Sequence, residues 1–477
     1  MKYLILSLIL FVACGGGTPT PPPAPLSASL PPEVPQYLRD LVDNKPTGIT
    51  YHMDIQEACA DNGNNGLFPT CNGGQSTGGK PNGPIKNFDG MWRENNPDGV
   101  ALSPGDELLI HAGIYAPADC TPSTQTLSIT FQGSQANPIR IRGEGMGITI
   151  LEGGFDLDDF DAQGNGGCGP TNHIDDYHQV PRLRLGGQWG IIENLTIQGC
   201  YQVCVSFWSG YDFVWQEIEI AGGIEDGIKT TESSGRFLVW RGDFHGWAGG
   251  GEALDNFGAD DTWYAHNTFH DNDRLIRPGV YGQVMWTKGG AHRVHIIENS
   301  FKDLIIESHA LNLGGCCWNN WSPPGGKGNE PVATDVEALR NTFTNITFNP
   351  ASTASYPGVL AVVGCWDCQA IGNTVVDSPN PFAVQATADN SNGWRVPPKN
   401  ILFQDNLAVG IPNGRIVSAT SLDELSTTTF SGNLYCLDES PTFSIKNESP
   451  DPMDWSAWQG RGFDTTSILA TTANCPP

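Results

Sequence analysis

The sequence predicts an all-β fold, a single-stranded right-handed parallel β-helix with capping segments at both ends and long inserted loops. Three observations indicate this solenoid. β-rich triplets that end in a polar residue or glycine recur at intervals of 22 to 42 residues, the shortest from Asn194 to Gln216 and the longest from Asn299 to Asn341. Signals for helices are nearly absent from the same region. A second series of strand-like runs is interrupted, each time, by a charged or polar residue.

The spacing of the triplets predicts the number of residues in each coil. The triplets end at Asn194, Gln216, Gly242, Asn267, Asn299, Asn341, Asn373, Asp405 and Gly432. Repeats of about 20 to 50 residues are typical of solenoids, and the longer intervals indicate loops inserted at the turns. Asparagine at a corner suits either a left-handed backbone or a stacked ladder of side-chain amides. A β-sandwich also has many short strands, but it lacks a register repeated in this way.

The N-terminus has the features of an export signal. Residues 1–13 contain one positive residue and a short apolar run, too short to span a bilayer. The Phe-Val-Ala-Cys ending resembles a bacterial lipoprotein box, which implies cleavage before Cys14 and lipidation of Cys14. The alternative is an ordinary signal peptide that happens to contain a cysteine. No aspartate follows Cys14, which resembles lipoproteins sorted to the outer membrane. We therefore expect an exported lipoprotein of the cell envelope or cell surface, with a membrane contact through the lipid only.

The remaining boundaries follow from composition. Residues 14–36 form a linker rich in Pro, Gly and Thr. Residues 37–99 form an N-terminal cap, residues 100–435 the β-helix and residues 436–477 a C-terminal cap. Trp455 and Trp458 are expected to cover the open edge of the last coil, which otherwise exposes unpaired backbone.

Charge and cysteine content restrict the partners and the compartment. The chain has 52 acidic and 25 basic residues and a net charge of −27, which excludes nucleic-acid binding through the bulk surface. An acidic polymer then requires calcium or a local basic patch. Of the 13 cysteines, removal of Cys14 leaves an even number, which favours disulfides in an exported chain.

Cysteine spacing suggests pairs without fixing them. The local candidates are Cys59–Cys71, Cys120–Cys168, Cys200–Cys204 and Cys436–Cys475, with two more bonds among Cys316, Cys317, Cys365 and Cys368. The last four are also a candidate zinc site.

The second series of segments predicts a row of polar residues on one face. The spacing from Lys229 to Asp255 matches one coil, so the two side chains are expected to pair across coils. The spacings on to Lys288 and to His309 or Asn312 also match about one coil each. The residues predicted to share the face are Asp226, Lys229, Glu252, Asp255, Lys288 and His309. The alternative is a ladder of solvated charges that offset one another. Nearby Trp240, Trp247, Trp263 and Trp286 favour a site, because sugar rings stack on aromatic side chains.

These motifs resemble those of the pectate-lyase-like superfamily of secreted parallel β-helix proteins. Asp226-Gly-Ile-Lys229, followed one coil later by Ala-Leu-Asp255, looks like their ladder of lysine and aspartate. Thr287-Lys288-Gly289 looks like the lysine region of alginate lyases and of the chondroitinase-B type. The resemblance implies β-elimination on a uronate-containing polysaccharide, with a lysine removing the proton alpha to the uronate carboxylate and Ca²⁺ or another cation neutralising that carboxylate.

The resemblance also assigns roles. It implies Lys288 or Lys229 as the base, with its pKa depressed by a nearby cation. Asp226, Glu252 and Asp255 become candidate ligands of Ca²⁺, and no other cofactor is expected. His309 stands where the chondroitinase-B type has an arginine, so it joins the catalytic candidates. Arg274, Arg277, Trp286 and Asn312 are the candidates for substrate binding.

Two further clusters carry alternatives. Asp156, Asp158, Asp159 and Asp161 form an acidic turn that is a second candidate for Ca²⁺. Asp260 and Asp261 lie near His266 and His270 in the sequence, and paired carboxylates are typical of glycoside hydrolases.

The sequence thus leaves three functions open. The first is a tethered polysaccharide lyase, the second is a non-catalytic surface protein that binds glycan or a protein partner, and the third is a glycoside hydrolase. A basic or calcium-bearing cleft favours the first, and a closed ladder of Lys–Asp pairs favours the second.

Overall fold

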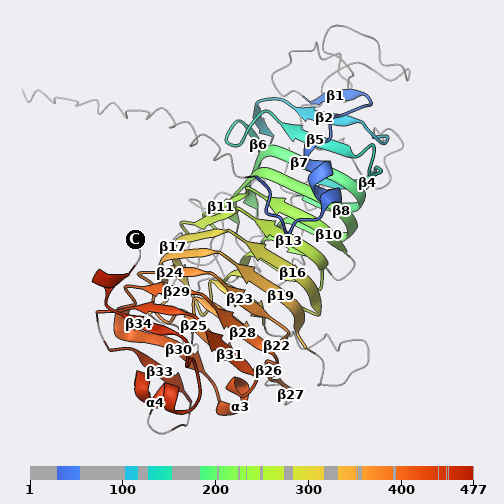
Figure 1. The fold of residues 1–477 in the computed structure, drawn as a ribbon. Helices are drawn as coiled ribbons and strands as arrows, with labels where there is room; N and C mark the ends of the chain where they lie inside the picture. Colours follow the sequence, from blue (N-terminus) through green and yellow to red (C-terminus); the bar gives the residue numbers. More distant parts are fainter. Residues whose placement is uncertain are drawn as a thin grey trace, which may run out of the picture.

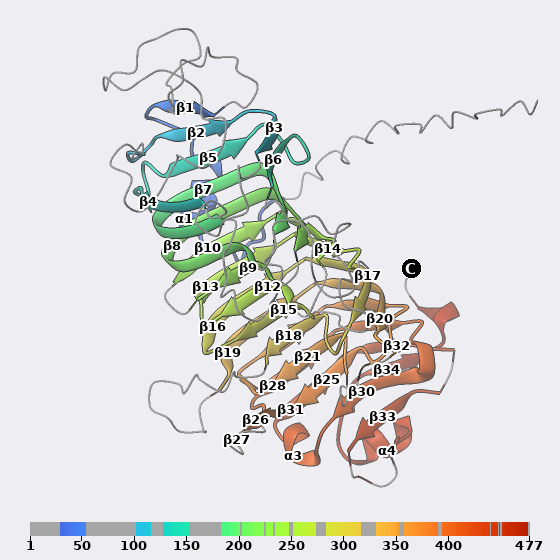
Figure 2. The same cartoon turned by 180° about the vertical axis from the view of Figure 1, so that it is seen from behind.

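The computed structural model describes most of the chain from Ser29 to Cys475. The described residues are 29–53, 102–115, 127–152, 183–200, 203–223, 226–231, 234–247, 251–272, 283–315, 331–350, 352, 357–389, 394–438, 440–446, 448 and 451–475. They form a parallel β-helix, as predicted: all but two of the named strands join one continuous parallel sheet that winds into coils. Each coil contributes strands to three faces, which we name sheets A, B and C (Figures 1 and 2).

Sheet A carries the predicted row of charged residues and is seen in Figure 2. Its strands are β4 (Leu127–Gln132), the first part of β7 (Leu183–Cys200) and of β8 (Val203–Gly223), β9 (Asp226–Thr230), β12 (Glu252–Phe257), β15 (Gln283–Lys288), β18 (Leu311–Gly314), β21 (Leu360–Val363), β25 (Phe382–Gln385), β30 (Arg415–Ala419) and β33 (Thr442–Ile445).

Sheet B follows sheet A around each coil. Its strands are β1 (Thr50–Met53), β2 (Glu107–Ile110), β5 (Ile139–Gly143), the middle of β7 and β8, β10 (Ser234–Trp240), β13 (Asp260–Ala265), β16 (Ala291–Ile297), β19 (Ala333–Leu339), β22 (Cys365–Trp366), β23 (Gln369–Ile371), β28 (Ile401–Gln404) and β31 (Thr428–Ser431).

Sheet C closes the coil. Its strands are β3 (Gly113–Tyr115), β6 (Thr149–Glu152), the last part of β7 and β8, β11 (Asp243–His245), β14 (Thr268–His270), β17 (Ser300–Ile306), β20 (Thr342–Phe348), β24 (Thr374–Val376), β29 (Leu407–Val409), β32 (Leu434–Cys436) and β34 (Ile468–Ala470). A separate antiparallel hairpin joins β26 (Thr387–Asp389) and β27 (Trp394–Val396).

The corner between sheets B and C explains the sequence repeat. Its first residue has a positive φ, as at Glu298 (55°) and Arg340 (54°). The next residue is an inward asparagine whose Nδ2 donates to the Oδ1 of the asparagine one coil on, at 2.9–3.0 Å. This ladder comprises Asn267, Asn299, Asn341, Asn373, Asn406 and Asn433.

The predicted series departs from the corner register in four coils. Asn194 is the positive-φ residue of its corner, and Gln216 comes one residue before the positive-φ Glu217. In the last two coils the series is early by one residue. Asp405 and Gly432 are the positive-φ residues of their corners, and the amide ladder continues at Asn406 and Asn433. Short polar side chains and glycine both tolerate the left-handed region, so the two corner positions have similar composition in the sequence.

Apolar side chains of the three sheets fill the inside of the coil. On sheet C, the rings of Phe244, Phe269, Phe301 and Phe343 stack from coil to coil with centroids 4.7–4.8 Å apart. These distances equal the spacing of hydrogen-bonded strands, so each ring meets its equivalent in the next coil. The stack fixes the register of neighbouring coils and thereby the relative positions of the outward side chains.

The N-terminal helix lies on the side of the solenoid. Helix α1 (Gln36–Asp43) places Leu38 and Leu41 against the outer face of sheet B, where they pack with Val214, Leu238 and Trp263. Figure 1 shows α1 crossing the strands of sheet B. Strand β1, by contrast, pairs with β2 at the edge of the first coil.

Short helices and aromatic rings surround the last coils. Helix α3 spans Leu422–Leu425, α4 spans Trp455–Gly460, and the 3₁₀ turns η2 and η3 span Pro412–Gly414 and Thr472–Asn474. Trp458 is fully buried and stacks on Phe443 of β33 at 4.6 Å, while Trp455 lies 5.6 Å from the same ring. Apolar area at this end is thereby removed from water.

Three disulfides join described cysteines. Cys200–Cys204 and Cys436–Cys475 confirm two predicted pairs. Cys365 bonds to Cys368, so these two do not serve as zinc ligands together with their predicted neighbours. Cys14 and the remaining cysteine candidates, Cys59, Cys71, Cys120, Cys168, Cys316 and Cys317, lie outside the described residues.

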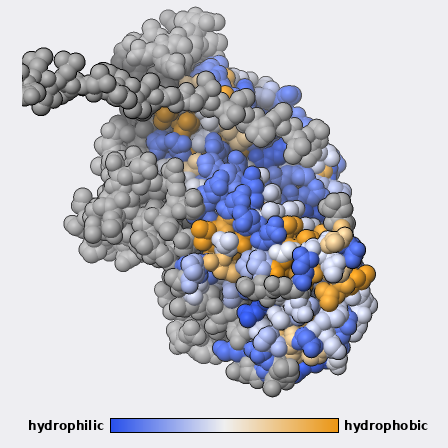
Figure 3. All heavy atoms as spheres, turned by 90° about the vertical axis from the view of Figure 1, so that its left-hand side faces the viewer, coloured by the Kyte–Doolittle hydropathy of each residue, from blue (hydrophilic) through white to orange (hydrophobic). Residues whose placement is uncertain are grey.

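The visible surface of the described residues contains both hydrophilic and hydrophobic areas. Figure 3 shows mainly hydrophilic residues on one side of the molecule, with hydrophobic residues gathered below the middle of the view. Within the described part of the chain, every helix is too short or too polar to cross a membrane.

Candidate functional site

A row of outward side chains crosses sheet A in register. Lys229 of β9 pairs with Asp255 of β12, which pairs with Trp286 of β15, which in turn pairs with Asn312 of β18. The predicted pairing of Lys229 with Asp255 one coil apart is therefore confirmed. Trp286 and Asn312, both predicted to contact substrate, belong to the same row.

The predicted register of Lys288 is wrong by two residues. Trp286, not Lys288, lies opposite Asp255, and Lys288 pairs with Phe257. Insertions at the turns change the spacing along the chain without changing the register, so counting residues misplaces this lysine. Its side chain nevertheless lies over the Trp286 ring, with Nζ 4.5 Å from the ring centroid. Nζ thereby reaches Asp255 Oδ1 and Glu252 Oε1, each at 3.3 Å.

Five charged side chains are thus in direct contact. We name Asp226, Lys229, Glu252, Asp255 and Lys288 the Lys–Asp cluster. Lys229 Nζ lies 2.9 Å from Asp226 Oδ2 and 3.0 Å from Asp255 Oδ2, and the backbone N–H of Glu252 donates to Asp226 Oδ1 at 3.0 Å. The Asp255 side chain is completely buried, whereas Lys229 is the most exposed of the five at 21%. Solvent therefore reaches the cluster mainly at Lys229.

Both lysines are held in the protonated form. Burial lowers the pKa of Lys229, but the carboxylates of Asp226 and Asp255 raise it by more, and the net shift is upward. Burial likewise lowers the pKa of Lys288, but the nearby acidic groups of Asp255 and Glu252 raise it by more, so its net shift is also upward. The expected depression of the lysine pKa is therefore wrong for the chain by itself, because the nearest charges are negative.

The carboxyl groups separate into two kinds. Burial raises the pKa of Glu252 well above its ordinary value, and repulsion from Asp255 and Asp226 raises it further against the attraction of Lys288. Burial also raises the pKa of Asp226, but Lys229 and a hydrogen bond with Glu252 outweigh it, so the net shift is downward. The pKa values of Glu252 and Asp226 are therefore driven in opposite directions, a pattern that occurs in pairs of an acid and a base in enzymes.

The predicted calcium ligands do come together. One oxygen from each of Asp226, Glu252 and Asp255 lies within 4.8 Å of the others. Ca²⁺ binds oxygen at about 2.3–2.6 Å, so this spacing alone suits the ion. However, the ammonium groups of Lys229 and Lys288 already lie between these carboxylates at 2.9–3.3 Å. A divalent cation in the same space would be repelled by both, so the cluster as folded does not fit Ca²⁺.

His309 lies in an adjacent row. Its backbone N–H donates to Gln283 Oε1 at 2.7 Å, and Gln283 is the register partner of Glu252. Its Nδ1 lies 3.1 Å from the carbonyl oxygen of Gly358. Burial lowers the pKa of His309 to about 4, although the Gly358 contact opposes the shift. The imidazole is therefore neutral at ordinary pH, with Nδ1 donating to Gly358.

The structure separates the residues of the hydrolase alternative. Asp261 faces Arg293 at a corner, with Nη2 and Oδ2 at 2.8 Å. His270 is on sheet C and contacts Asp243 at 2.8 Å, while His266 lies 3.5 Å from Glu298 at another corner. These residues do not form one site. Arg274, Arg277 and the acidic turn of Asp156, Asp158, Asp159 and Asp161 lie outside the described residues.

Sequence reasoning missed the N-terminal extension of the row. Ser206 of β8 pairs with Lys229, and Arg184 of β7 pairs with Ser206. Counting one coil back from Lys229 locates Ser206, but β7 and β8 are long continuous strands without the polar interruption that identified the later coils. The raised pKa of Glu252 depends on burial among other carboxylates and has no signal in the sequence.

Comparisons with known proteins give only distant structural similarities. No family model and no curated relative matches the chain. Among solved structures it is similar to an alginate lyase from Paenibacillus sp. str. FPU-7, with 14% identity over 72% of this chain and 92% of that chain and a TM-score of 0.39. It is also similar to pectate lyase Pel9A, with 12% identity, coverage of 83% and 82% and a TM-score of 0.38.

A third similar structure is the GH136 lacto-N-biosidase from Eubacterium ramulus, with 11% identity over 89% of this chain and 67% of that chain and a TM-score of 0.42. At these identities and TM-scores, the likenesses say nothing about the activity of this chain.

Proposed function

We propose that this chain is an exported carbohydrate-active enzyme that cleaves a uronate-containing polysaccharide by β-elimination at the Lys–Asp cluster. One observation carries the proposal: Glu252, whose pKa is raised, lies in mutual contact with two lysine ammonium groups and two aspartates on the outer face of sheet A beside Trp286. β-Elimination needs a cation for the uronate carboxylate, a base for the proton alpha to it, and an acid for the leaving oxygen.

The geometry suggests a role for each group. Lys229, the most exposed, pairs with the uronate carboxylate. To act as a base, Lys288, whose Nζ lies 3.3 Å from Asp255 Oδ1, must first release its proton to solvent. The neutral amine of Lys288 removes the proton alpha to the carboxylate, the electrons of that C–H bond form the C=C bond, and the glycosidic C–O bond breaks. Glu252 donates its proton to the leaving oxygen.

The test uses the full chain with alginate, pectate and glycosaminoglycans, each with added Ca²⁺ and with a chelator. Ultraviolet absorbance detects the unsaturated uronate product, and a reducing-end assay detects any cleavage. We expect an unsaturated product in both ionic conditions, because the ammonium group of Lys229 supplies the positive charge for the uronate carboxylate. Lys288→Met and Glu252→Gln should each lower the rate by about a hundredfold or more, the usual contribution of a general acid or base.

Lys399→Met is the matched control. Lys399 also stacks on a tryptophan, with Nζ 5.0 Å from the Trp366 ring, but lies outside the cluster. Its loss should leave the rate unchanged. Absence of an unsaturated product from every polymer would overturn the lyase proposal, and full activity in Lys288→Met would overturn the assignment of the base.

Hydrolysis is the second candidate, and the opposite pKa shifts of Glu252 and Asp226 favour it specifically. A glycoside hydrolase needs one protonated and one ionised carboxyl group. New reducing ends without ultraviolet absorbance would identify this reaction. Binding of a polymer without either product would leave a non-catalytic glycan-binding protein, for which the mutual neutralisation of the Lys–Asp cluster is the supporting observation.

We also propose that Cys14 carries a lipid that tethers the chain to the cell envelope, on the outer membrane or at the cell surface. The lipoprotein-like sequence before Cys14 supports this. Expression in a Gram-negative host with radiolabelled palmitate should label the wild-type chain and not Cys14→Ser. Equal labelling of the two, or labelling of neither, would contradict it.

A further inference from the structure

A hollow on sheet A lies beside the coils that carry the cluster. It has a volume of about 490 Å³ and is formed by the ends of the sheet A segments of β4, β7 and β8. Ser206 of β8 is the register partner of Lys229, and Ser209, which lines the hollow, is three residues further along the same strand. A polymer bound at the cluster can therefore continue across the hollow.

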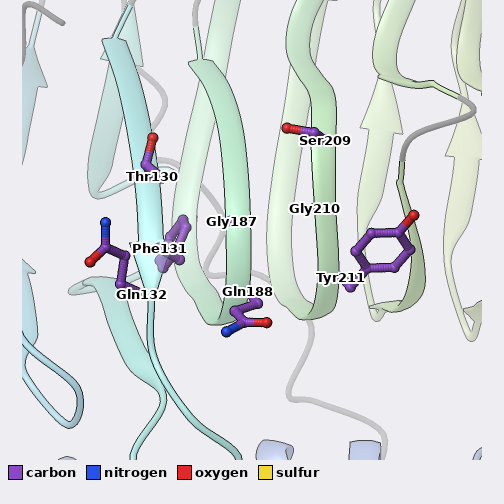
Figure 4. Close-up of a pocket in the computed structure, with 8 residues that line it drawn as sticks. All are labelled: Thr130, Phe131, Gln132, Gly187, Gln188, Ser209, Gly210 and Tyr211. Carbon is purple, nitrogen blue, oxygen red and sulfur yellow. The ribbon is translucent and has the colours of Figure 1, made fainter.

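Among the described residues that line the hollow, the phenol of Tyr211 is the single ionisable group. Gln132, Gln188 and Tyr211 are register partners on three successive strands, and all three are exposed. Figure 4 shows these side chains side by side across the strands, with the hydroxyls of Thr130 and Ser209 above them. Amides and hydroxyls donate and accept hydrogen bonds without attracting charge, which suits the hydroxyl groups of a sugar.

The floor of the hollow is made of backbone. The register shifts between Leu185 and Gly186, a bulge that disturbs the ladder between β7 and β8. Gly187 has a φ of 91°, and a Cβ there would clash with the carbonyl oxygen of Phe131. Bulges of this kind often occur beside binding sites, and glycine permits close approach to the backbone. A flat ring can therefore lie on this floor.

Tyr211 provides a fixed aromatic wall. Its side chain is 42% exposed, the only aromatic among the large apolar side chains that are exposed in the described part of the chain. The guanidinium of Arg236 lies over the ring, 5.1 Å from its centroid. Asp212 holds Arg236 through two hydrogen bonds, at 2.9 Å to Nε and 2.7 Å to Nη2. With one face covered by Arg236, the opposite face is the one that a ligand can stack on.

We propose that this hollow binds an uncharged sugar residue, and that the substrate is a heteropolysaccharide whose neutral units lie on β4, β7 and β8 while its uronate lies at Lys229. The second part rests on the proposed function, whereas the first part does not. The strands β4, β7 and β8 that form the hollow are three, two and one positions away from β9, which carries Lys229. Neighbouring strands are about 4.8 Å apart. Along the strand, Ser209 and Tyr211 lie three and five residues beyond Ser206, the register partner of Lys229, so units a few residues apart in one polymer chain can occupy both.

The test is binding to the full chain by calorimetry, with hexasaccharides of glucose, mannose and galactose as uncharged probes and hexagalacturonate as the charged probe. At least one uncharged hexasaccharide should bind. Tyr211→Ala should weaken that binding by about fivefold or more, the usual effect of truncating a central aromatic contact. Tyr211→Phe should retain it, because the ring is kept. Gln404→Ala, which removes an amide from β28 on sheet B, is the control and should bind like the wild type.

Each outcome bears on the inference. If no uncharged hexasaccharide binds, or if Tyr211→Ala binds as well as the wild type, the inference is wrong. If Tyr211→Ala weakens hexagalacturonate and uncharged probes equally, the hollow does not select neutral sugars and the inference is again wrong. The assay measures binding and not cleavage. Neutral sugars can therefore be found to bind even if the chain has no lyase activity. Conversely, cleavage of a pure polyuronate with no binding of neutral probes would leave the proposed function intact and remove this inference.

Discussion

At Lys229 and Lys288, burial and charge act in opposite directions. Burial favours the neutral amine, whereas the adjoining carboxylates favour the ammonium, and the carboxylates prevail. The residue types and the coil spacing predicted that these groups would meet. They did not predict the protonation states, because those depend on the contact distances and on the exclusion of water from Asp255.

Removal of Lys288 should destabilise the fold. Its Nζ is one of two ammonium groups that neutralise the buried Asp255. Loss of one partner from a buried ion pair typically costs about 3–5 kcal/mol. Lys288→Met should therefore lower the free energy of unfolding by about this amount, measured by urea denaturation. Lys399→Met should change it by less than about 1 kcal/mol, since that lysine is exposed. Equal stability of the two variants would contradict the ion-pair geometry.

The raised pKa of Glu252 predicts a pH dependence. In the unfolded chain Glu252 ionises above pH about 4.3, whereas in the folded chain it keeps its proton to higher pH. The folded state therefore binds the extra proton, and the stability from this group is present below pH about 4.3 and lost as pH rises through the folded pKa. Relative to Glu252→Gln, the wild type should lose about 1.4 kcal/mol per pH unit within this window. Parallel stability curves for the two proteins would show that the pKa is not raised.

At the scale of the element, the corner between sheets B and C holds the coils in register. Asn341 illustrates this: its Oδ1 accepts the backbone N–H and the Nδ2 of Asn299, each at 2.9 Å. Its Nδ2 donates to the carbonyl of Ile296 and to Asn373. The sequence identified this corner from its repeat but did not distinguish the ladder position from the positive-φ position before it, because both accept asparagine.

Asn341→Ala should therefore be costly. It removes the acceptor of the backbone N–H and Nδ2 of Asn299 and the side-chain donor to the carbonyl of Ile296, at about 1–3 kcal/mol for each unsatisfied group, whereas Asn373 Oδ1 keeps the backbone N–H of residue 341. We expect a loss of at least about 3 kcal/mol in the free energy of unfolding. Asn345→Gly is the control, since Asn345 is an exposed positive-φ residue of the same coil. A similar loss in both variants would mean that the ladder contributes no more than an exposed corner.

The register of sheet A could be predicted from the sequence only in part. Where the loops were short, between Lys229 and Asp255, counting residues placed the pair correctly. Where residues were inserted, before Lys288, the count was wrong by two. The hollow at Tyr211 was not predicted, because it arises from a bulge at Gly186 and from neighbours that are distant in the sequence.

At the scale of the whole molecule, each coil contacts mainly its neighbours, so stability should be transmitted along one dimension. Trp458 is fully buried at the C-terminal end, stacked on Phe443. Trp458→Ala should cost about 3–5 kcal/mol. Hydrogen exchange should show lost protection in β30, β32, β33 and β34 but unchanged protection in β4, β7 and β8.

Trp366→Ala provides the comparison, because Trp366 is partly exposed and lies two coils before the last strand of sheet B. It should leave exchange in the last coils unchanged. Uniform loss of protection throughout the solenoid in Trp458→Ala would show that the molecule unfolds as one cooperative unit.

Helix α1 introduces one exception to this nearest-neighbour arrangement. With the residues just before it, it packs against side chains from β7, β8, β10, β13, β16 and β19, and Glu33 contacts Arg340 at 2.9 Å. The first described residues, Ser29 and Leu30, therefore lie on the flank of the rod and not at its end. A mechanical force applied at the start of α1 therefore acts on several coils at once, across the direction of the strands. Such a force must separate α1 from sheet B before it can detach a coil at either end.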